Sequence, residues 1–168
     1  MSETTTLVAP ANTDLGHAKE VIQSVYKQVF GNRHLMELDI NQSLEALFMN
    51  GDLTVQGFVT ALAQSETYRK LFLEPNSPYR FVELNFKHLL GRSPHDQAEL
   101  MSHVRLMNEH GYEAEIASYT YSEEYLRVFG VDQDPFNRST QTFSGGRTVN
   151  FSRALAVAAG YAGFDGAE

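Results

Sequence analysis

The sequence predicts an all-α fold, a compact bundle of about six to eight short helices with an extended C-terminal arm. Apolar residues recur at intervals of three and four along most of the chain, as they do on the buried face of a helix. Glycine and proline residues interrupt these runs at short intervals and mark helix ends. We find no convincing run with the period of two that a strand would show.

The first half of the chain contains four expected helices. Residues 1–16 lack periodicity and are interpreted as a flexible lead-in. Gly31 and Gly51 end helices, because glycine accepts the left-handed backbone conformation found there. Asp52 and Thr54 offer N-cap oxygens. The helices are expected at about 16–30, 41–49 and 55–65, followed by a short one that ends near Phe72.

The second half contains four more expected helices and then changes in character. Pro94 suits the first turn of a helix, with Ser93 as its cap. The helices are expected at about 79–90, 94–110, 113–119 and 122–129. The segment 132–146 is rich in polar residues and glycine, and a short helix is expected near 150–159. We therefore expect a folded domain at 17–130 and an arm with a short helix at 131–168.

A repeated pattern divides the domain into two units. The segment YKQVFG that ends at Gly31 recurs as FKHLLG ending at Gly91, an offset of 60 residues. Gly51 recurs as Gly111 at the same offset, and SETY at 65–68 recurs as SEEY at 122–125. Units of about 60 residues made of short helices bury little apolar surface alone, so we expect the two to pack together with approximate two-fold symmetry.

Composition excludes several classes of protein. The 168 residues are 42% hydrophobic, enough for a core, and no apolar run approaches the length needed to span a bilayer. The chain has no cysteine, so it forms no disulfide and carries no pigment through a thioether. Its net charge of −8 argues against sequence-independent nucleic-acid binding. The segment from Phe136 to Phe164 nevertheless contains three arginines and no acidic residue.

Three patterns have a chemical and a structural interpretation, and we favour the structural one for each. His103 and His110 share a helix face with Glu99, but two turns separate the histidines, which is too far for one metal ion. Glu123 and Glu124 follow Ser122 as acids do in the first turn of a capped helix. The segment 145–148 (GGRT) lacks the spacing and the lysine of a phosphate loop and is interpreted as a hinge.

Four segments together resemble the linker polypeptides of the phycobilisome, the cyanobacterial and red-algal antenna. They are YKQVFGN at 26–32, GDLTVQGFVTALAQSETY at 51–68, FVELNFKHLLGR at 81–92 and GYEAEIASYTYSEEYLRVFG at 111–130. The segment PFNR at 135–138 is similar to the family's exit from the domain. GGRTVNFSRALAVAAGY at 145–161 is similar to the extension of rod-type linkers.

The resemblance implies a non-catalytic structural protein with an all-α domain. Such a domain binds in the central cavity of phycobiliprotein trimers and hexamers, directs their stacking and tunes the bilins that these partners carry. The implied partners are the α and β subunits of phycocyanin, phycoerythrin or allophycocyanin, and other linkers. The implied location is peripheral, on the cytoplasmic (stromal) face of the photosynthetic thylakoid membrane. No second, smaller linker domain is recognised at the C-terminus, which favours a rod-terminal, rod-core or specialised linker over a standard rod linker.

Candidate interface residues are of two kinds. Aromatic residues at helix ends or in the arm lack a fold to cover them, unlike Phe30, Phe58, Phe86 and Phe129, which are expected in the core. Basic residues in the domain and arm are suited to pair with acids on the ring subunits. The full set is Tyr79, Arg80, Lys87, Arg92, Arg105, Tyr119, Tyr121, Phe136, Arg138, Phe143, Arg147, Phe151 and Arg153.

Two other functions remain open from the sequence. One is a generic helical adaptor that binds another protein without any link to pigments. The other is a small helical enzyme or regulator that shares the duplicated unit, although we find no nucleophile–base pair, metal set or phosphate loop to support it.

Overall fold

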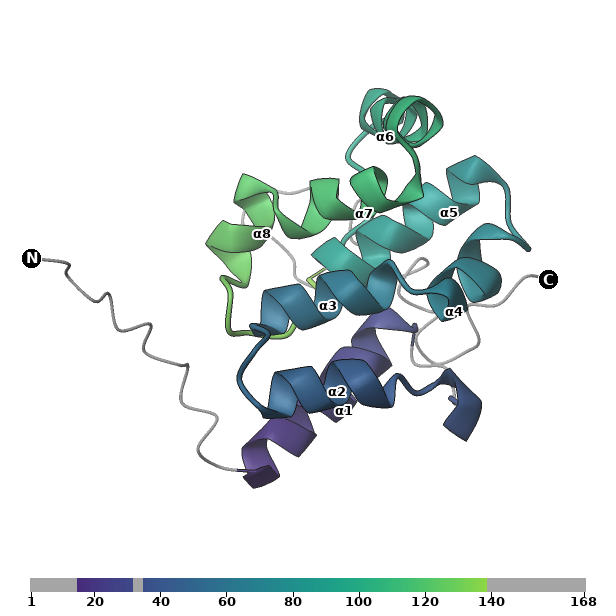
Figure 1. Cartoon of the computed structure of the whole chain (residues 1–168). Coiled ribbons are helices and arrows are strands. Elements are labelled where there is room, and N and C mark those ends of the chain that lie inside the picture. The colour runs from purple at the N-terminus through teal and green to yellow at the C-terminus, as the bar shows by residue number, and fades with distance from the viewer. Residues whose placement is uncertain (1–14, 32–34, 139–168) are drawn as a thin grey trace, which may run out of the picture.

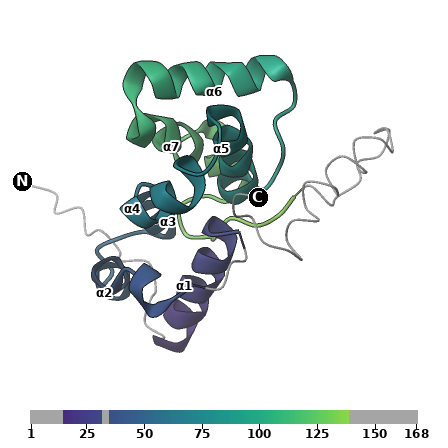
Figure 2. The same cartoon turned by 90° about the vertical axis from the view of Figure 1, so that its right-hand side faces the viewer.

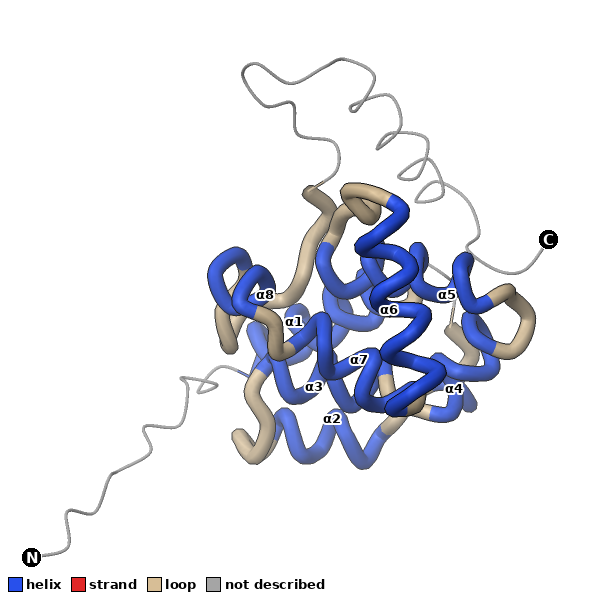
Figure 3. Tube along the Cα trace, turned by 90° about the horizontal axis from the view of Figure 1, so that it is seen from above, coloured by secondary structure: helices blue, strands red, loops and turns tan. Residues whose placement is uncertain are grey.

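The computed structural model describes residues 15–31 and 35–138, which form helices and turns without a strand (Figure 3). The predicted all-α class is therefore confirmed. The elements of the first half are α1 (Leu15–Val29), the 3₁₀ turn η1 (Glu37–Asp39), α2 (Gln42–Met49), α3 (Val55–Ala63), α4 (Glu66–Tyr68) and the π turn η2 (Arg69–Leu73). Those of the second half are α5 (Pro78–Asn85), the π turn η3 (Phe86–Leu90), α6 (Gln97–His110), α7 (Tyr112–Thr120) and α8 (Glu123–Val128).

Side-chain caps explain where most of these helices begin. The Ser65 hydroxyl accepts a hydrogen bond from the Tyr68 N–H at 3.3 Å, and Ser122 does the same for Tyr125 at 3.1 Å. Such caps satisfy one of the N–H groups that a helix start leaves unpaired. The interpretation of Ser122 as the start of a helix is therefore confirmed.

The start of α6 differs from the prediction. Pro94 lies before the helix, and Asp96 is the residue that caps it, because the Asp96 carboxylate accepts the Glu99 N–H at 2.8 Å. A charged acceptor at the positive end of the helix is favoured over the Ser93 hydroxyl. The predicted helix start at residue 94 was wrong by about one turn.

Aromatic side chains fill the core between the helices. The four phenylalanines predicted to be internal, Phe30, Phe58, Phe86 and Phe129, are all buried. Tyr68, Tyr119 and Tyr125, together with Phe48, Phe72 and Phe81, are buried with them. Leu47 on α2, in contrast, is exposed.

The helices are arranged with α3, α5 and α7 in the middle of the domain. Helices α1 and α2 cover one side of this centre (Figure 1). Helix α6 is the outermost on the opposite side, where it lies across α5 and α7 (Figure 2). As a result, α6 buries only Leu100 and Val104 and leaves one long face to solvent.

Two contacts join residues at the offset of the sequence repeat. The hydroxyl oxygens of Thr60 on α3 and Thr120 on α7 lie 2.8 Å apart. The Gln28 side-chain amide donates to the carbonyl oxygens of Lys87 and His88, at 3.2 Å each. Residues near a two-fold axis contact their own counterparts in this way. These contacts are consistent with a duplicated unit, which stays a prediction.

Residues 131–138 lie against the domain, beyond the boundary predicted at residue 130. The Val131 carbonyl oxygen accepts from the Gln56 N–H at 3.0 Å, and Asp134 accepts from the Ser24 hydroxyl. Pro135 is buried, and the Arg138 N–H donates to the Gly91 carbonyl oxygen at 2.7 Å. The packed chain therefore continues to Arg138. The predicted lead-in up to residue 14 and the arm from residue 139 lie outside the described residues.

Candidate functional site

The predicted interface residues fall into three groups. Tyr79, Arg80, Arg105, Tyr121 and Phe136 are exposed, as an interface requires. Lys87, Arg92 and Tyr119 are buried, and Arg138 is partly buried. The residues outside the described part of the chain are Phe143, Arg147, Phe151 and Arg153, together with the predicted hinge at 145–148.

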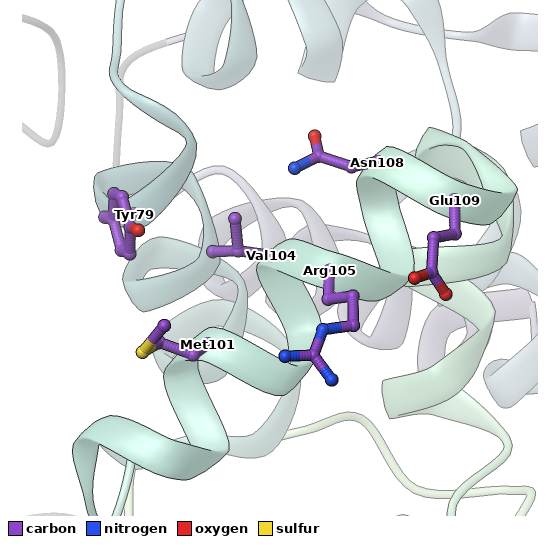
Figure 4. Close-up of a pocket in the computed structure, with 6 residues that line it drawn as sticks. All are labelled: Tyr79, Met101, Val104, Arg105, Asn108 and Glu109. Atoms are coloured by element: carbon purple, nitrogen blue, oxygen red, sulfur yellow. The ribbon is translucent and has the colours of Figure 1, made fainter.

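Tyr79 and Arg105 belong to one shallow surface pocket of about 240 Å³ between α5 and α6. Figure 4 shows Tyr79, near the start of α5, facing Met101 and Val104 on α6. Arg105, Asn108 and Glu109 complete the lining. The side chains of Tyr79 and Met101 are each 47% exposed. The pocket therefore offers an apolar floor with charged and amide groups at its edge, which suits one side chain of a protein partner.

Arg92 is a correction to the predicted interface, because its guanidinium is held inside the domain. It donates two hydrogen bonds of 2.7 Å to Glu124 and bonds of 2.9 and 3.2 Å to Glu99. Its carbon Cζ also lies 5.1 Å from the centre of the Phe86 ring. Two bidentate carboxylate pairs satisfy most of the donors of this arginine. The sequence offered no reason to pair residue 92 with residue 124.

Arg138 enters the same cluster from the exit segment, since its guanidinium lies 2.8 Å from Glu124 Oε1. Hydrogen bonds from Arg92 and Arg138 lower the pKa of the Glu124 carboxyl to about 2. The pKa of Glu99 is subject to opposing effects: burial raises it, but the hydrogen bond from Arg92 brings it below its ordinary value. Two cations and two anions therefore form a balanced cluster, which we call the Arg92 cluster (Arg92, Glu99, Glu124 and Arg138).

Lys87 and Tyr119 are further corrections. The Tyr119 side chain is fully buried, where its ring stacks on His103 at 4.4 Å and meets Phe86 edge-on. Lys87 lies on η3 and is only 3% exposed. Both were proposed as surface residues because they lie near helix ends or carry charge. Helix α6 packs on α7 around Tyr119, whereas α1 and α7 contact η3, which carries Lys87.

A chain of polar side chains in the interior leads to His103, one of the histidines considered for metal binding. The Tyr68 hydroxyl donates to Asn85 Oδ1 at 2.8 Å, and Asn85 Nδ2 donates to Glu115 Oε2 at 2.7 Å. Glu115 Oε1 lies 3.5 Å from His103 Nδ1. Burial raises the pKa of the Glu115 carboxyl. His103 therefore has a protein partner, and among the described residues no group of three or more potential ligands is placed to hold a metal ion.

Exposed aliphatic residues are the part of the surface that the sequence interpretation missed. Met36 and Leu38, before and within η1, are 66% and 96% exposed, and Met101 of the α5–α6 pocket is half-exposed. The signal for Met101 was present, because it falls outside the stripe formed by Leu100 and Val104. Exposed aliphatic side chains of this size are common at protein interfaces.

Comparison with known protein families shows what this domain is similar to. The profile of the family described as Phycobilisome Linker polypeptide matches residues 13–138, about three quarters of the chain. The chain belongs to this family. The match ends at Arg138, which closes the Arg92 cluster and is the last residue that the structure describes.

Curated relatives carry the same family name and are rod proteins. The chain is 45% identical to "Phycobilisome 37.5 kDa linker polypeptide, phycocyanin-associated, rod" of Microchaete diplosiphon, over 92% of this chain and 59% of the relative. It is 44% identical to a 32.3 kDa phycocyanin-associated rod linker of Picosynechococcus sp., over 94% of this chain and 54% of the relative. A 27.9 kDa phycoerythrin-associated rod linker of Microchaete diplosiphon is 39% identical, over 99% of this chain and 67% of the relative.

The chain thus spans between half and two thirds of the length of the first two relatives. The resemblance recognised in the sequence to phycobilisome linkers is confirmed. Within residues 15–31 and 35–138, no helix of the linker domain is long and apolar enough to cross a membrane.

Proposed function

We propose that the protein is a non-catalytic structural linker that binds in the central cavity of phycobiliprotein trimers or hexamers and directs their assembly. The observation that carries the proposal is the family match over the whole packed domain. Relatives that match nearly all of this chain are named as associated with phycocyanin and with phycoerythrin, so a phycobiliprotein is the partner to test first.

The exposed candidates supply the contact with the ring. Tyr79 and Arg105 line the α5–α6 pocket, and Arg80 lies next to Tyr79 at the start of α5. Tyr121 and Phe136 present aromatic rings elsewhere on the domain. Arginine and tyrosine are the side chains that most often dominate binding at protein interfaces. Arg80 lies 3.4 Å from Glu83, and Glu109 lines the pocket with Arg105, so these arginines would pair with acids of the ring from a surface of mixed charge.

The arm from residue 139 is proposed to reach a neighbouring ring or the core, or another linker. Phe143, Arg147, Phe151 and Arg153 are its contact candidates. The support is compositional, since this segment contains arginine and phenylalanine and no acidic residue before Phe164.

Effects on pigments would act through the partner. The chain has no cysteine to hold a bilin covalently, so the bilins concerned belong to the phycobiliprotein. A charge or ring placed near such a bilin shifts its absorption and restricts its motion. The proposed location is peripheral, within the phycobilisome on the cytoplasmic (stromal) face of the photosynthetic membrane.

Sedimentation tests the proposal directly. The chain is mixed with purified phycocyanin, phycoerythrin or allophycocyanin trimers at moderate phosphate concentration. We expect it to co-sediment with at least one of them and to shift the absorption of the bilins. Absence of association with all three phycobiliproteins would contradict the proposal, and association with an unrelated helical protein instead would favour the adaptor.

Charge reversals at two exposed positions then test whether the α5–α6 pocket contacts the phycobiliprotein. Arg105→Glu places a negative charge in the α5–α6 pocket and is expected to weaken binding about tenfold or more, because like charges oppose each other across an interface. Lys19→Glu is the control, since Lys19 is an exposed cation on α1, on the side of the domain opposite α6. Equal loss of binding in both variants would show that only net charge matters.

A further inference from the structure

The exit segment from Val131 to Arg138 makes contacts with four different parts of the domain. Its first residue accepts from α3 through Gln56, and Asp134 accepts from α1 through Ser24. The Phe136 ring meets the Phe129 ring edge-on at 5.0 Å, just after α8. Arg138 bonds to the carbonyl oxygen of Gly91, after η3. A segment without helix or strand is thus attached at each end and in the middle.

The exit segment passes so close to Gly91 that there is no room for a side chain at residue 91. Its φ is +70°, and a Cβ added there would overlap the backbone carbonyl oxygen of Phe136 and lie 3.2 Å from the Arg138 nitrogen. Gly111 has a similar left-handed φ of +91°, but an added Cβ there would meet no atom within 4 Å. Glycine at 111 serves the backbone turn alone, whereas glycine at 91 also admits a crossing chain.

The Arg92 cluster fastens the far end of this segment. Glu124 accepts from Arg92 on one side and from Arg138 on the other, and Glu99 holds Arg92 in place. The exposed fractions of the four side chains lie between 9% and 26%, so solvent screens these interactions less than it screens a surface pair. The only member of the cluster outside the helical domain is Arg138.

We propose that residues 131–138 form a strap that closes over Gly91 and is latched by the pairing of Arg138 with Glu124, so that Arg138 is held at a defined point on the domain. With the strap closed, the residues that follow Arg138 start from that point. With the strap open, the same residues gain up to about 25 Å of reach, because an extended chain spans about 3.3 Å per residue.

Hydrogen exchange of the full chain tests the strap without any phycobiliprotein, so its outcome is independent of the proposed function. In the parent protein we expect the Arg138 amide, which donates to the Gly91 carbonyl oxygen, to be protected. Gly91→Ala should accelerate exchange of the Arg138 amide about tenfold or more, while Gly111→Ala leaves it near the parent rate, since local opening free energies set exchange. Equal acceleration by the two alanines, or an unprotected Arg138 amide in the parent, would overturn the strap.

A second pair of variants tests the latch in case Gly91→Ala does not fold. Arg138→Gln removes the charge that pairs with Glu124, and Arg127→Gln removes an exposed charge on α8. We expect only Arg138→Gln to accelerate exchange of the strap, with the α3 peptide around Phe58 unchanged as the internal reference. Acceleration of the strap and α3 together would mean that the segment is ordinary core, and no acceleration would mean that the latch is absent.

Discussion

Glu124 shows how a single carboxylate acquires two roles in this domain. The sequence places it in the first turn of α8, where an acid is favoured by the helix dipole. The structure adds Arg92 and Arg138 as partners. Removing one member of a partly buried cluster leaves the opposite charges unpaired, which costs more than the intact pairs contribute.

Glu124→Gln should therefore lower the free energy of unfolding by about 2 kcal/mol at neutral pH. The groups that face this carboxyl are Arg92 and Arg138, with Glu99 beyond Arg92. Arg92 and Arg138 hold its pKa at about 2 in the folded state, below the value of about 4.3 for an unfolded glutamate. The stabilisation is present above the unfolded value and is lost as the pH falls toward the folded one.

Urea unfolding between neutral pH and pH 2.5 measures this effect. The difference between the parent and Glu124→Gln should be largest near neutral pH and should shrink as the pH falls below about 4. Glu123→Gln is the matched control, because Glu123 is the exposed neighbour in the same helix turn. A difference in the free energy of unfolding that does not change with pH would contradict the low pKa assigned to Glu124.

Glu115 has the opposite pH behaviour because burial raises the pKa of its carboxyl. Between the unfolded and folded pKa values the folded chain holds a proton that the unfolded chain has lost, so stability falls as pH rises. Asn85 on α5 and His103 on α6 face this carboxyl, and Tyr119 lies on its own helix. Glu115→Gln keeps the acceptor for Asn85 and should be neutral or stabilising at pH 8.

Glu115→Ala, in contrast, leaves Asn85 without its acceptor and should destabilise the domain by about 2 kcal/mol or more. Thermal unfolding of Glu115→Gln and Glu115→Ala at pH 5 and pH 8 measures the difference in stability between the two variants. If the glutamine variant were as destabilised as the alanine variant at pH 8, a charged Glu115 would be required for folding.

At the scale of the helices, capping side chains fix where the short helices begin. Because α4 and α8 are short, each depends on its cap and on packing more than on helix propensity. The two caps occupy corresponding places in the sequence repeat, and each hydroxyl also donates to a carbonyl of the preceding helix. Similar local sequence thus produces the same turn twice.

Ser65→Ala and Ser122→Ala should each lower the free energy of unfolding by about 1 kcal/mol, the usual effect of removing a serine cap. Ser102→Ala is the control, since Ser102 is an exposed serine within α6 whose hydroxyl bonds to the Glu99 carbonyl. Loss of the Ser102 hydroxyl should lower the free energy of unfolding much less. Chemical denaturation measures all three, and a Ser102→Ala effect as large as the caps would contradict this account.

At the scale of the whole molecule, the strap is the last part of the folded unit that the structure describes. A chain ended after Arg138 keeps the contacts of residues 131–138 and should unfold like the parent within about 0.5 kcal/mol. A chain ended after Gly130 loses the hydrogen bonds to Gln56 and Gly91 and the Arg138 charge. It should still be helical by circular dichroism but less stable by about 2 kcal/mol.

Thermal and urea unfolding of both truncated chains provide the measurement. Equal stability of the two would show that residues 131–138 add nothing to the domain. An unfolded product after truncation at Arg138 would show that residues beyond the strap complete the core.

Sequence pattern alone determined the all-α class, most helix positions, the core phenylalanines and the family. Apolar periodicity, glycine stops and serine caps act over a few residues, so their consequences can be read locally. Gly51 illustrates this, since its positive φ of +82° follows from its place after the end of α2.

Only the tertiary structure decided which charged and aromatic residues are available to a partner. Arg92 and Tyr119 are of residue types common at interfaces, but both are buried. Arg92 is held by Glu99 of α6 and Glu124 of α8, and Tyr119 packs between His103 of α6 and Phe86 of η3, contacts that no local pattern encodes. The same long-range packing brings Arg138 to Gly91 and Glu124. Burial and charge pairing are set by residues far apart in the chain, and this is why the strap was visible only in three dimensions.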